Sequence, residues 1–160
     1  LMGNIPLTED RKPVNKRYFD ALPDNFRESA LLDRFHCFIE GWKLPRINTS
    51  MIFKGWTINV EYFSEIMHSM RTQNIYNQIY DELVEIAPNT DMRDSKAVKR
   101  IATAYMKLLF PHWRTVEDVN KPEFEIFCLN PAIYRRGIVK QQCHYIDPEF
   151  KMQMSGISMK

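Results

Sequence analysis

The chain has 160 residues, of which 44% are hydrophobic and 26% charged, and its formal net charge is +2 at pH 7. This balance is typical of one globular domain with a real core and excludes an intrinsically disordered chain. The nearly neutral charge gives no overall bias toward nucleic acid, and no apolar run approaches the roughly 20 residues that span a bilayer.

Residues 1–46 predict a short mixed segment that cannot bury a core by itself. Gly3-Asn4-Ile5 indicates the end of a buried strand, formed by the residues before it, entering a loop. Prolines break residues 6–28 into a connector with short turns. Residues 30–36 are typical of a short helix or turn, and residues 37–39 form a brief apolar run that is consistent with a buried strand but too short to decide alone.

Residues 47–150 carry the helical period of a bundle that can bury its own core. One apolar stripe at three- and four-residue steps begins after Asn59, a plausible cap. The second is ended by Pro88, and the third begins at an Asp91 or Asp94 cap and stops before Pro111. The stripes consist of Val60, Phe63, Met67 and Met70; Ile75, Ile79, Leu83 and Ile86; and Val98, Ile101, Tyr105 and Leu108, with Ala97, Ala104 and Leu109 beside the third.

Two prolines shape the rest of the bundle. Pro122 suits the first turn of a fourth helix, and Asn130-Pro131 either kinks that helix or begins a fifth that reaches about Cys143. Residues 151–160 show no period and indicate a linker. We therefore predict a mainly α fold, a bundle of four or five helices preceded by a short α/β segment. Trp42 and Trp56 flank the boundary between the two parts and are expected to pack there.

The cysteines and histidines give no sign of a metal centre. Cys37, Cys128 and Cys143 are widely spaced, which fits neither a disulfide framework nor a CxxC site. The four histidines do not pair with acids at helical metal-site spacing, so we expect no bound metal. The first six residues lack the charged region and long apolar segment of a secretion signal, and together with the free thiols this favours a cytoplasmic location.

Three separated motifs resemble those of AAA+ ATPases, in the same order. Gly3-Asn4-Ile5 resembles sensor 1, in which Asn4 would orient the attacking water. Residues 30–35, Ala-Leu-Leu-Asp-Arg-Phe, resemble the "ALLxRF" element of minichromosome maintenance helicases, and the resemblance implies that Arg34 would be the arginine finger. Residues 93–107 resemble the sensor 2 helix of the same helicases. Arg93 then stands at the sensor 2 position, and Arg100 is the alternative.

Each motif also has a structural explanation. A Gly-Asn pair is most often only a turn. Arg34 would suit a surface ion pair with Asp33 or Glu40. Arg93 would be an exposed residue at a helix start without a functional role, although the helix dipole disfavours a cation there. Arg135-Arg136 with Lys140, together with Arg34, Lys43 and Arg46, would suit a phosphate backbone or, more simply, a solvated face.

The combined strings resemble one family more closely. Leu-Leu-Asp-Arg-Phe-His at residues 31–36, Gly41-Trp42 with Pro45, and Lys-Leu-Leu-Phe-Pro-His at residues 107–112 are similar to the Lon-like ATPases of bacterial BREX phage-defence systems, the BrxL group. The resemblance runs over nearly the whole chain. It implies that residues 1–46 are the edge of the nucleotide-binding core, that residues 47–150 are the helical lid, and that residues 151–160 lead onward.

The resemblance also implies a function for a longer protein. That protein would bind ATP and Mg²⁺, form homo-oligomeric rings, and act on DNA in phage restriction. The 160 residues contain no Walker A string, no acidic Walker B strand and no Ser–Lys dyad. We therefore expect this stretch alone to bind no nucleotide and to hydrolyse neither ATP nor peptides. A stand-alone helical DNA-binding or adaptor module, with residues 1–46 as an arm, remains the alternative.

Overall fold

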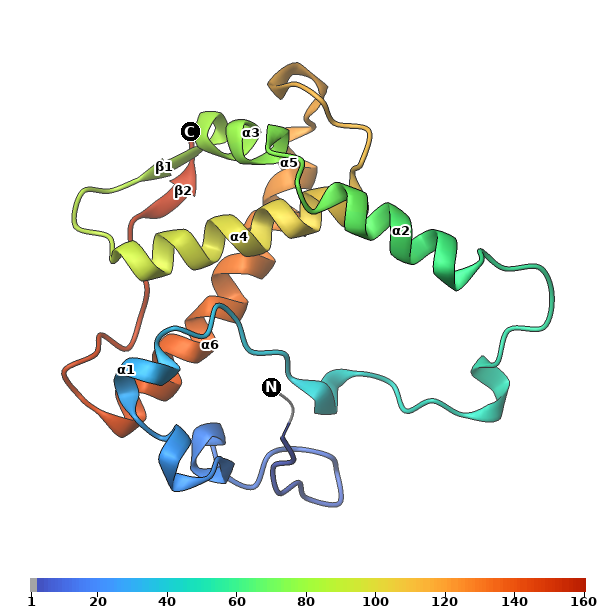
Figure 1. The fold of residues 1–160 in the computed structure, drawn as a ribbon. Coiled ribbons are helices and arrows are strands. Elements are labelled where there is room, and N and C mark those ends of the chain that lie inside the picture. Colours follow the sequence, from blue (N-terminus) through green and yellow to red (C-terminus); the bar gives the residue numbers. More distant parts are fainter. Residues whose placement is uncertain (1–2) are drawn as a thin grey trace.

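Helices dominate the computed structural model, which describes residues 3–160 (Figure 1). The predicted mainly α class is confirmed. The predicted strand end before Gly3 lies outside the described residues. No helix of the described part is both long and apolar enough to cross a bilayer. The helices are α1 (Ser29–Leu32), α2 (Val60–Met70), α3 (Ile75–Leu83), α4 (Met92–Leu109), α5 (Lys121–Phe124) and α6 (Asn130–Ile146), and the strands are β1 (Val84–Ile86) and β2 (Ile157–Met159).

Helix α4 lies at the centre and crosses α6 (Figure 1). The predicted Asp91 cap is confirmed, because its Oδ1 accepts a hydrogen bond from the backbone N–H of Arg93 at 2.8 Å. The buried face differs from the predicted stripe, since Leu108 and Leu109 are about half exposed. The side chains that α6 and α3 cover instead follow four-residue steps, at Asp94, Val98, Ala102 and Met106.

The two prolines act in one nearly continuous helical stretch, residues 121–146. Pro122 lies in the first turn of α5, as predicted. The five residues before Asn130 form a π turn, Glu125–Leu129, which leads directly into α6. Pro131 has no N–H to donate and its ring crowds the carbonyl one turn earlier, so a widened turn before it relieves the clash. Asn130-Pro131 therefore follows a local widening of the helix.

The region after α3 is a strand and not the predicted continuation of the helix. Helix α3 ends at Leu83, and Val84–Ile86 form β1, so Ile86 belongs to a strand and not to the apolar helix stripe. Strand β1 pairs antiparallel with Ile157–Met159, with Val84 opposite Met159. Because the last ten residues show no period, the sequence did not reveal that three of them complete a two-stranded sheet. The domain boundaries after residues 46 and 150 stay predictions.

The N-terminal segment packs against the second half of α6. Phe19 and Leu32 form a small apolar cluster with Val139 and Cys143. The side chain of Gln142 joins the two parts, because its Oε1 accepts from the Tyr18 N–H at 2.6 Å and its amide donates to the carbonyl of Lys16 at 2.8 Å. These contacts join residues that are more than a hundred positions apart in the sequence, and they hold the short helix α1 against α6.

Residues 37–39, whose sequence is consistent with a buried strand but too short to decide, do not form one. Cys37 and Ile39 are exposed, and the Phe38 N–H donates to the Arg135 carbonyl, so this stretch runs along α6 without a strand partner in the described chain. Phe38 packs with Tyr18 and Trp42 instead. A single extended segment has no ladder to join unless a neighbouring strand is present, and no strand lies beside it here.

Residues 44–66, which we name the outer arm, leave the body of the molecule and return through α2 (Figure 1). The predicted helix and its Asn59 cap are confirmed, with Asn59 accepting from two backbone N–H groups. The expectation that Trp56 packs at the boundary is wrong, because its side chain is 100% exposed. Exposed apolar side chains of the outer arm are Leu44, Ile47, Met51, Ile52, Phe53, Trp56, Ile58, Val60, Tyr62, Phe63 and Ile66.

Candidate functional site

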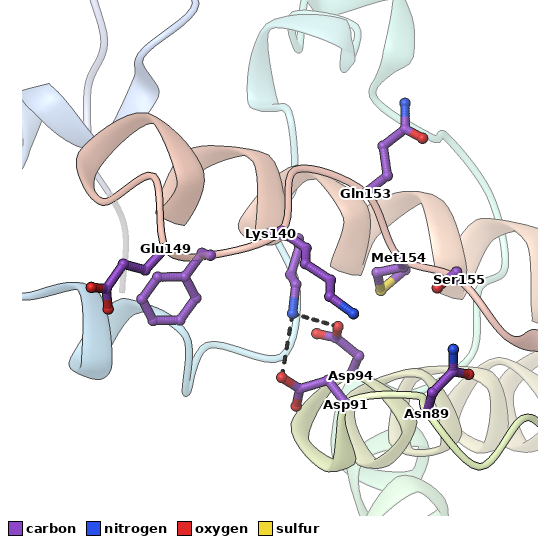
Figure 2. A pocket seen from close by; sticks show the side chains of 10 residues that line it. Asn89, Asp91, Asp94, Lys140, Glu149, Gln153, Met154 and Ser155 are labelled. Carbon is purple, nitrogen blue, oxygen red and sulfur yellow. Dashed lines mark hydrogen bonds and ion pairs between the residues drawn. The ribbon is translucent and has the colours of Figure 1, made fainter.

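Two hollows lie on either side of a group of buried charges. The larger, about 390 Å³, opens between the start of α4, α6 and the C-terminal segment (Figure 2). Lys140 is nearly fully buried there and donates to Asp94 Oδ2 at 2.7 Å and to Asp91 Oδ2 at 3.4 Å. Because these three charges already neutralise one another in part, this hollow carries no free cation from Lys140 for an anionic ligand.

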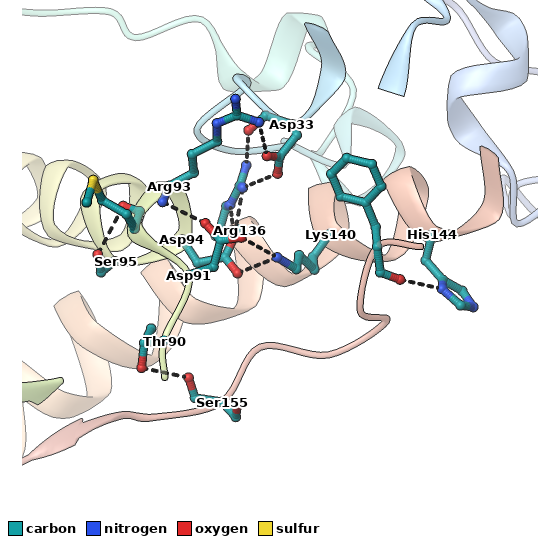
Figure 3. Close-up of polar contacts among 12 residues, drawn as sticks. Asp33, Thr90, Asp91, Arg93, Asp94, Ser95, Arg136, Lys140, His144 and Ser155 are labelled. Atoms are coloured by element: carbon teal, nitrogen blue, oxygen red, sulfur yellow. Dashed lines mark hydrogen bonds and ion pairs between the residues drawn. The ribbon is translucent and has the colours of Figure 1, made fainter. Parts of the chain in front are cut away.

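The buried charges centre on Arg136, which is 0% exposed (Figure 3). Its Nη2 donates to Asp33 Oδ1 at 2.6 Å, and its Nε donates to Asp94 Oδ1 at 2.8 Å. Nη2 also lies 2.7 Å from the same Asp94 oxygen as part of the ion pair. Its Nη1 donates to the backbone carbonyls of Asp33 at 2.9 Å and Phe35 at 2.6 Å. Four hydrogen bonds and ion pairs with two carboxylates therefore hold the guanidinium, which are the partners that a buried arginine requires.

Arg93 extends this network to the surface. Its Nη1 donates to Asp33 Oδ2 at 2.7 Å, while the side chain stays 49% exposed. One carboxylate of Asp33 thus contacts a buried guanidinium through one oxygen and a half-exposed guanidinium through the other (Figure 3). The turn after α1, the start of α4 and the middle of α6 meet at this carboxylate.

The second hollow, about 220 Å³, opens beside Arg93. Its charged lining holds five cations, one of them the internally paired Arg136, against a single carboxylate. Exposed like charges this close repel one another in the absence of a counter-ion, so the hollow favours an anion. The lining consists of Asp33, Arg34, His36, Arg93, Lys96, Ala97, Arg100 and Arg136.

The pKa of His36 reflects the positive potential of this hollow. Burial is the largest cause of its lowered pKa, and the neighbouring cations lower the pKa further, with Arg100 contributing the most among them. Arg100 Nη1 lies 2.8 Å from His36 Nε2, and a guanidinium can only donate, so the imidazole is neutral and carries its proton on Nδ1. This contact joins two residues that line the hollow and restricts the orientation of the Arg100 guanidinium.

Three of the four predicted site residues come together here. Arg34, Arg93 and Arg100 line the same hollow. Arg34 is exposed and takes part in none of the ion pairs found between residues 3 and 160, and the predicted alternative partners, Asp33 and Glu40, bond to other cations. Asn4 does not line the hollow, and its role as sensor 1 stays a prediction.

The interpretation of Arg136 and Lys140 as a DNA-facing patch or a solvated face is wrong, because both side chains are buried in ion pairs. A signal for this was present in the sequence. Arg136 lies at three- and four-residue steps within a buried apolar stripe of α6, and a cation in such a stripe indicates a buried ion pair. The stripe consists of Leu129, the last residue of the π turn, and of Ala132, Arg136, Val139 and Cys143 in α6.

The chain is similar to known proteins over nearly its full length. Residues 1–155 match the family model described as "Lon-like protease BrxL-like, ATPase domain". The chain is 28% identical over 142 residues to a protein named Lon-like protease BrxL from Escherichia coli O9:H4 (strain HS). It is 27% identical over 143 residues to a protein of the same name from Bacillus cereus (strain H3081.97). Each alignment covers 88% of this chain but only 20% of the relative, so the chain spans about a fifth of the length of these curated relatives.

Proposed function

The chain belongs to the BrxL-like ATPase-domain family, and from this premise we propose that it supplies the phosphate-facing arginines and the helical lid of a longer Lon-like AAA+ ATPase. ATP and Mg²⁺ would be held by residues of the longer protein, because the 160 residues contain no Walker A string. The hollow beside Arg93 would receive the terminal phosphate.

The observation that supports this proposal is the convergence of Arg34, Arg93 and Arg100 on one hollow. Phosphoryl transfer spreads negative charge over the oxygens of the transferring group, and planar, permanently charged guanidinium groups stabilise that charge. Arg34 is exposed and forms no ion pair with residues 3–160, so its donors are available to a phosphate. Arg93 is half exposed and directed at the same space.

The shared hollow has a consequence for assembly. Because Arg34 and Arg93 line one hollow, a single phosphate would contact both. We propose that this phosphate belongs to a nucleotide bound by the neighbouring subunit of a homo-oligomeric ring, with Arg34 as the finger that reaches across. Hydrolysis in one subunit would then depend on the position of α4 in the next.

The wider role follows from the resemblance of the motifs. We propose that the ring acts on DNA in the cytoplasm during phage defence. The relatives are named Lon-like proteases. We propose that any peptide hydrolysis by the longer protein takes place outside this chain, because the sequence of the 160 residues shows no Ser–Lys pattern typical of a nucleophile and its base.

The test is Arg34→Ala in the longer protein. We expect ring ATPase turnover to fall by about a thousandfold or more, the effect of losing an arginine finger, while ATP binding is spared. Arg71→Ala is the matched control, because Arg71 is exposed in the turn after α2 and does not line the hollow. Steady-state turnover and equilibrium ATP binding would be measured side by side. Retained turnover in Arg34→Ala would overturn the assignment.

A further inference from the structure

Arg136 is fully buried at the inner wall of the hollow, where its donors are taken up by protein acceptors, and its hydrogen bonds converge on the residues around Arg34 and Arg93. We propose that Arg136 is a positioning residue that fixes the positions of both phosphate-facing arginines, Arg34 and Arg93. The idea that Arg34 and Arg93 contact a phosphate rests on the proposed function. The way in which Arg136 holds them rests on the contacts described above.

The first effect is on the backbone of Arg34. Arg136 Nη1 donates to the carbonyl of Asp33 at 2.9 Å and to the carbonyl of Phe35 at 2.6 Å, the residues on either side of Arg34. One planar guanidinium nitrogen thus holds the peptide groups that flank the finger. The backbone is fixed from the buried side, and the side chain of Arg34 projects from a rigid base.

The second effect reaches Arg93 through Asp33. Arg136 holds Asp33 Oδ1, and the other oxygen, Oδ2, accepts from Arg93. The carboxylate is 2% exposed and has little freedom to rotate. The orientation of Arg93 toward the hollow therefore depends on the bond between Asp33 and Arg136.

The charge balance leaves Arg93 free to change partner. Two buried carboxylates, Asp33 and Asp94, face two buried cations, Arg136 and Lys140, so the buried group is neutral without Arg93. When an anion enters the hollow, the donors of Arg93 that do not bond Asp33 can turn to it, and any weakening of the Arg93–Asp33 bond strands no buried charge because Arg136 still neutralises Asp33. A buried network that needed Arg93 would oppose that movement.

Lysine cannot replace Arg136 in this role. A guanidinium presents five donors in a fixed plane, whereas an ammonium presents three donors from one point. Arg136→Lys keeps the charge that balances Asp33 and Asp94 but cannot reach both carboxylates and both carbonyls. The variant therefore separates the positioning of the two arginines from the neutralisation of the buried acids.

The test measures binding of tripolyphosphate, the phosphate part of a nucleotide, to the 160-residue chain by calorimetry. The unaltered chain should bind it without a Walker A string, because Arg34, Arg93, Lys96 and Arg100 line the hollow, and no detectable binding would overturn the proposal.

We expect Arg136→Lys to weaken binding about tenfold, the loss of one well-aligned charge-assisted contact. Arg135→Lys is the matched control, since it is the same substitution one position away on α6, where the side chain lies over the Tyr105 ring and outside the network. Unchanged affinity in a folded Arg136→Lys chain would overturn the proposal.

A second comparison separates positioning from a general structural effect. In a chain that carries both Arg34→Ala and Arg93→Ala, the added Arg136→Lys change should alter tripolyphosphate affinity by less than about twofold, because the residues through which Arg136 acts are gone. If the added change still weakens binding about tenfold, Arg136 acts through some other route and the proposal fails.

Measurements on the unaltered chain keep the proposal testable if Arg136→Lys does not fold. Backbone order parameters of residues 33–35 should be near 0.85, the value of rigid backbone. The guanidinium resonances of Arg34 and Arg93 should shift on addition of tripolyphosphate, and that of Arg136 should not. Order parameters below about 0.6 at residues 33–35 would overturn the proposal.

The two proposals fail differently. If Arg34→Ala keeps full turnover in the longer protein, the proposed function fails whatever Arg136 does. If Arg34→Ala abolishes turnover but Arg136→Lys leaves both tripolyphosphate affinity and turnover unchanged, the function stands and the positioning role of Arg136 is overturned. We expect Arg136→Lys to lower kcat about tenfold and to leave the KM for ATP nearly unchanged.

Discussion

The helical lobe, residues 75–146, and the outer arm, residues 44–66, are both rich in large apolar side chains but use them in opposite ways. In the lobe, Tyr76, Val98 and Phe124 are fully buried in one continuous core. In the arm, Phe53 is 69% exposed and Trp56 is completely exposed. Apolar content therefore does not decide burial. The lobe is crossed by α4 and α6 and closes on itself, whereas the arm has no second layer within the described chain.

The sharpest test of this comparison is one substitution made in both regions. Phe124→Ala removes a fully buried ring from the lobe, and we expect a loss of about 3–5 kcal/mol in the free energy of unfolding. Phe53→Ala in the outer arm should change it by less than about 0.5 kcal/mol. Chemical denaturation of the 160-residue chain measures both. Equal losses would mean that the arm belongs to the folding core.

A second test asks whether burial also governs the charged groups. Asp94→Asn removes the carboxylate that Arg136 and Lys140 share inside the lobe, and we expect a loss of about 3 kcal/mol because two buried cations lose a partner. Asp81→Asn is the control, since Asp81 pairs with Lys99 at the surface of the same lobe, where such pairs contribute about 0–1 kcal/mol. A small effect of Asp94→Asn would contradict a closed buried network.

The smallest effect concerns local opening. Trypsin should cut after Arg46 and Lys54 in the outer arm on the order of a hundred times faster than after Lys140 in the lobe, because backbone that buries few contacts opens at little free-energy cost. Mass spectrometry of the first fragments identifies the sites. First cleavage within residues 121–146 would reverse the expected order of stability between the two regions.

Local chemistry was predicted most accurately from sequence. The Asp91 and Asn59 caps and the place of Pro122 follow from short-range rules about backbone N–H groups, and the structure confirms all three. The helical period of α2 was also recognised. Its burial was not, because a period identifies an apolar face without identifying what covers it. Trp56 and Leu108 were misplaced for the same reason.

For the candidate site, too, the sequence identified individual residues but not how they are arranged. The motifs singled out Arg34, Arg93 and Arg100 individually, and nothing in their spacing placed them around one hollow. Arg136 was assigned to a surface although its position in the α6 stripe indicated burial. Its partner Asp33 lies 103 positions away, and a contact over that distance is fixed by the packing of α1, α4 and α6 and not by any local pattern.

The sequence by itself determined the helical class, the caps and the identity of the cations, because these depend on residues within a few positions of one another. The tertiary structure decided which cations are neutralised and which face an open hollow, because that depends on the carboxylates that distant segments bring close. Arg34 and Arg136 are the same residue type. Arg34 is exposed and forms no ion pair with residues 3–160, whereas Arg136 is buried and makes four hydrogen bonds; the crossing of the helices causes this difference.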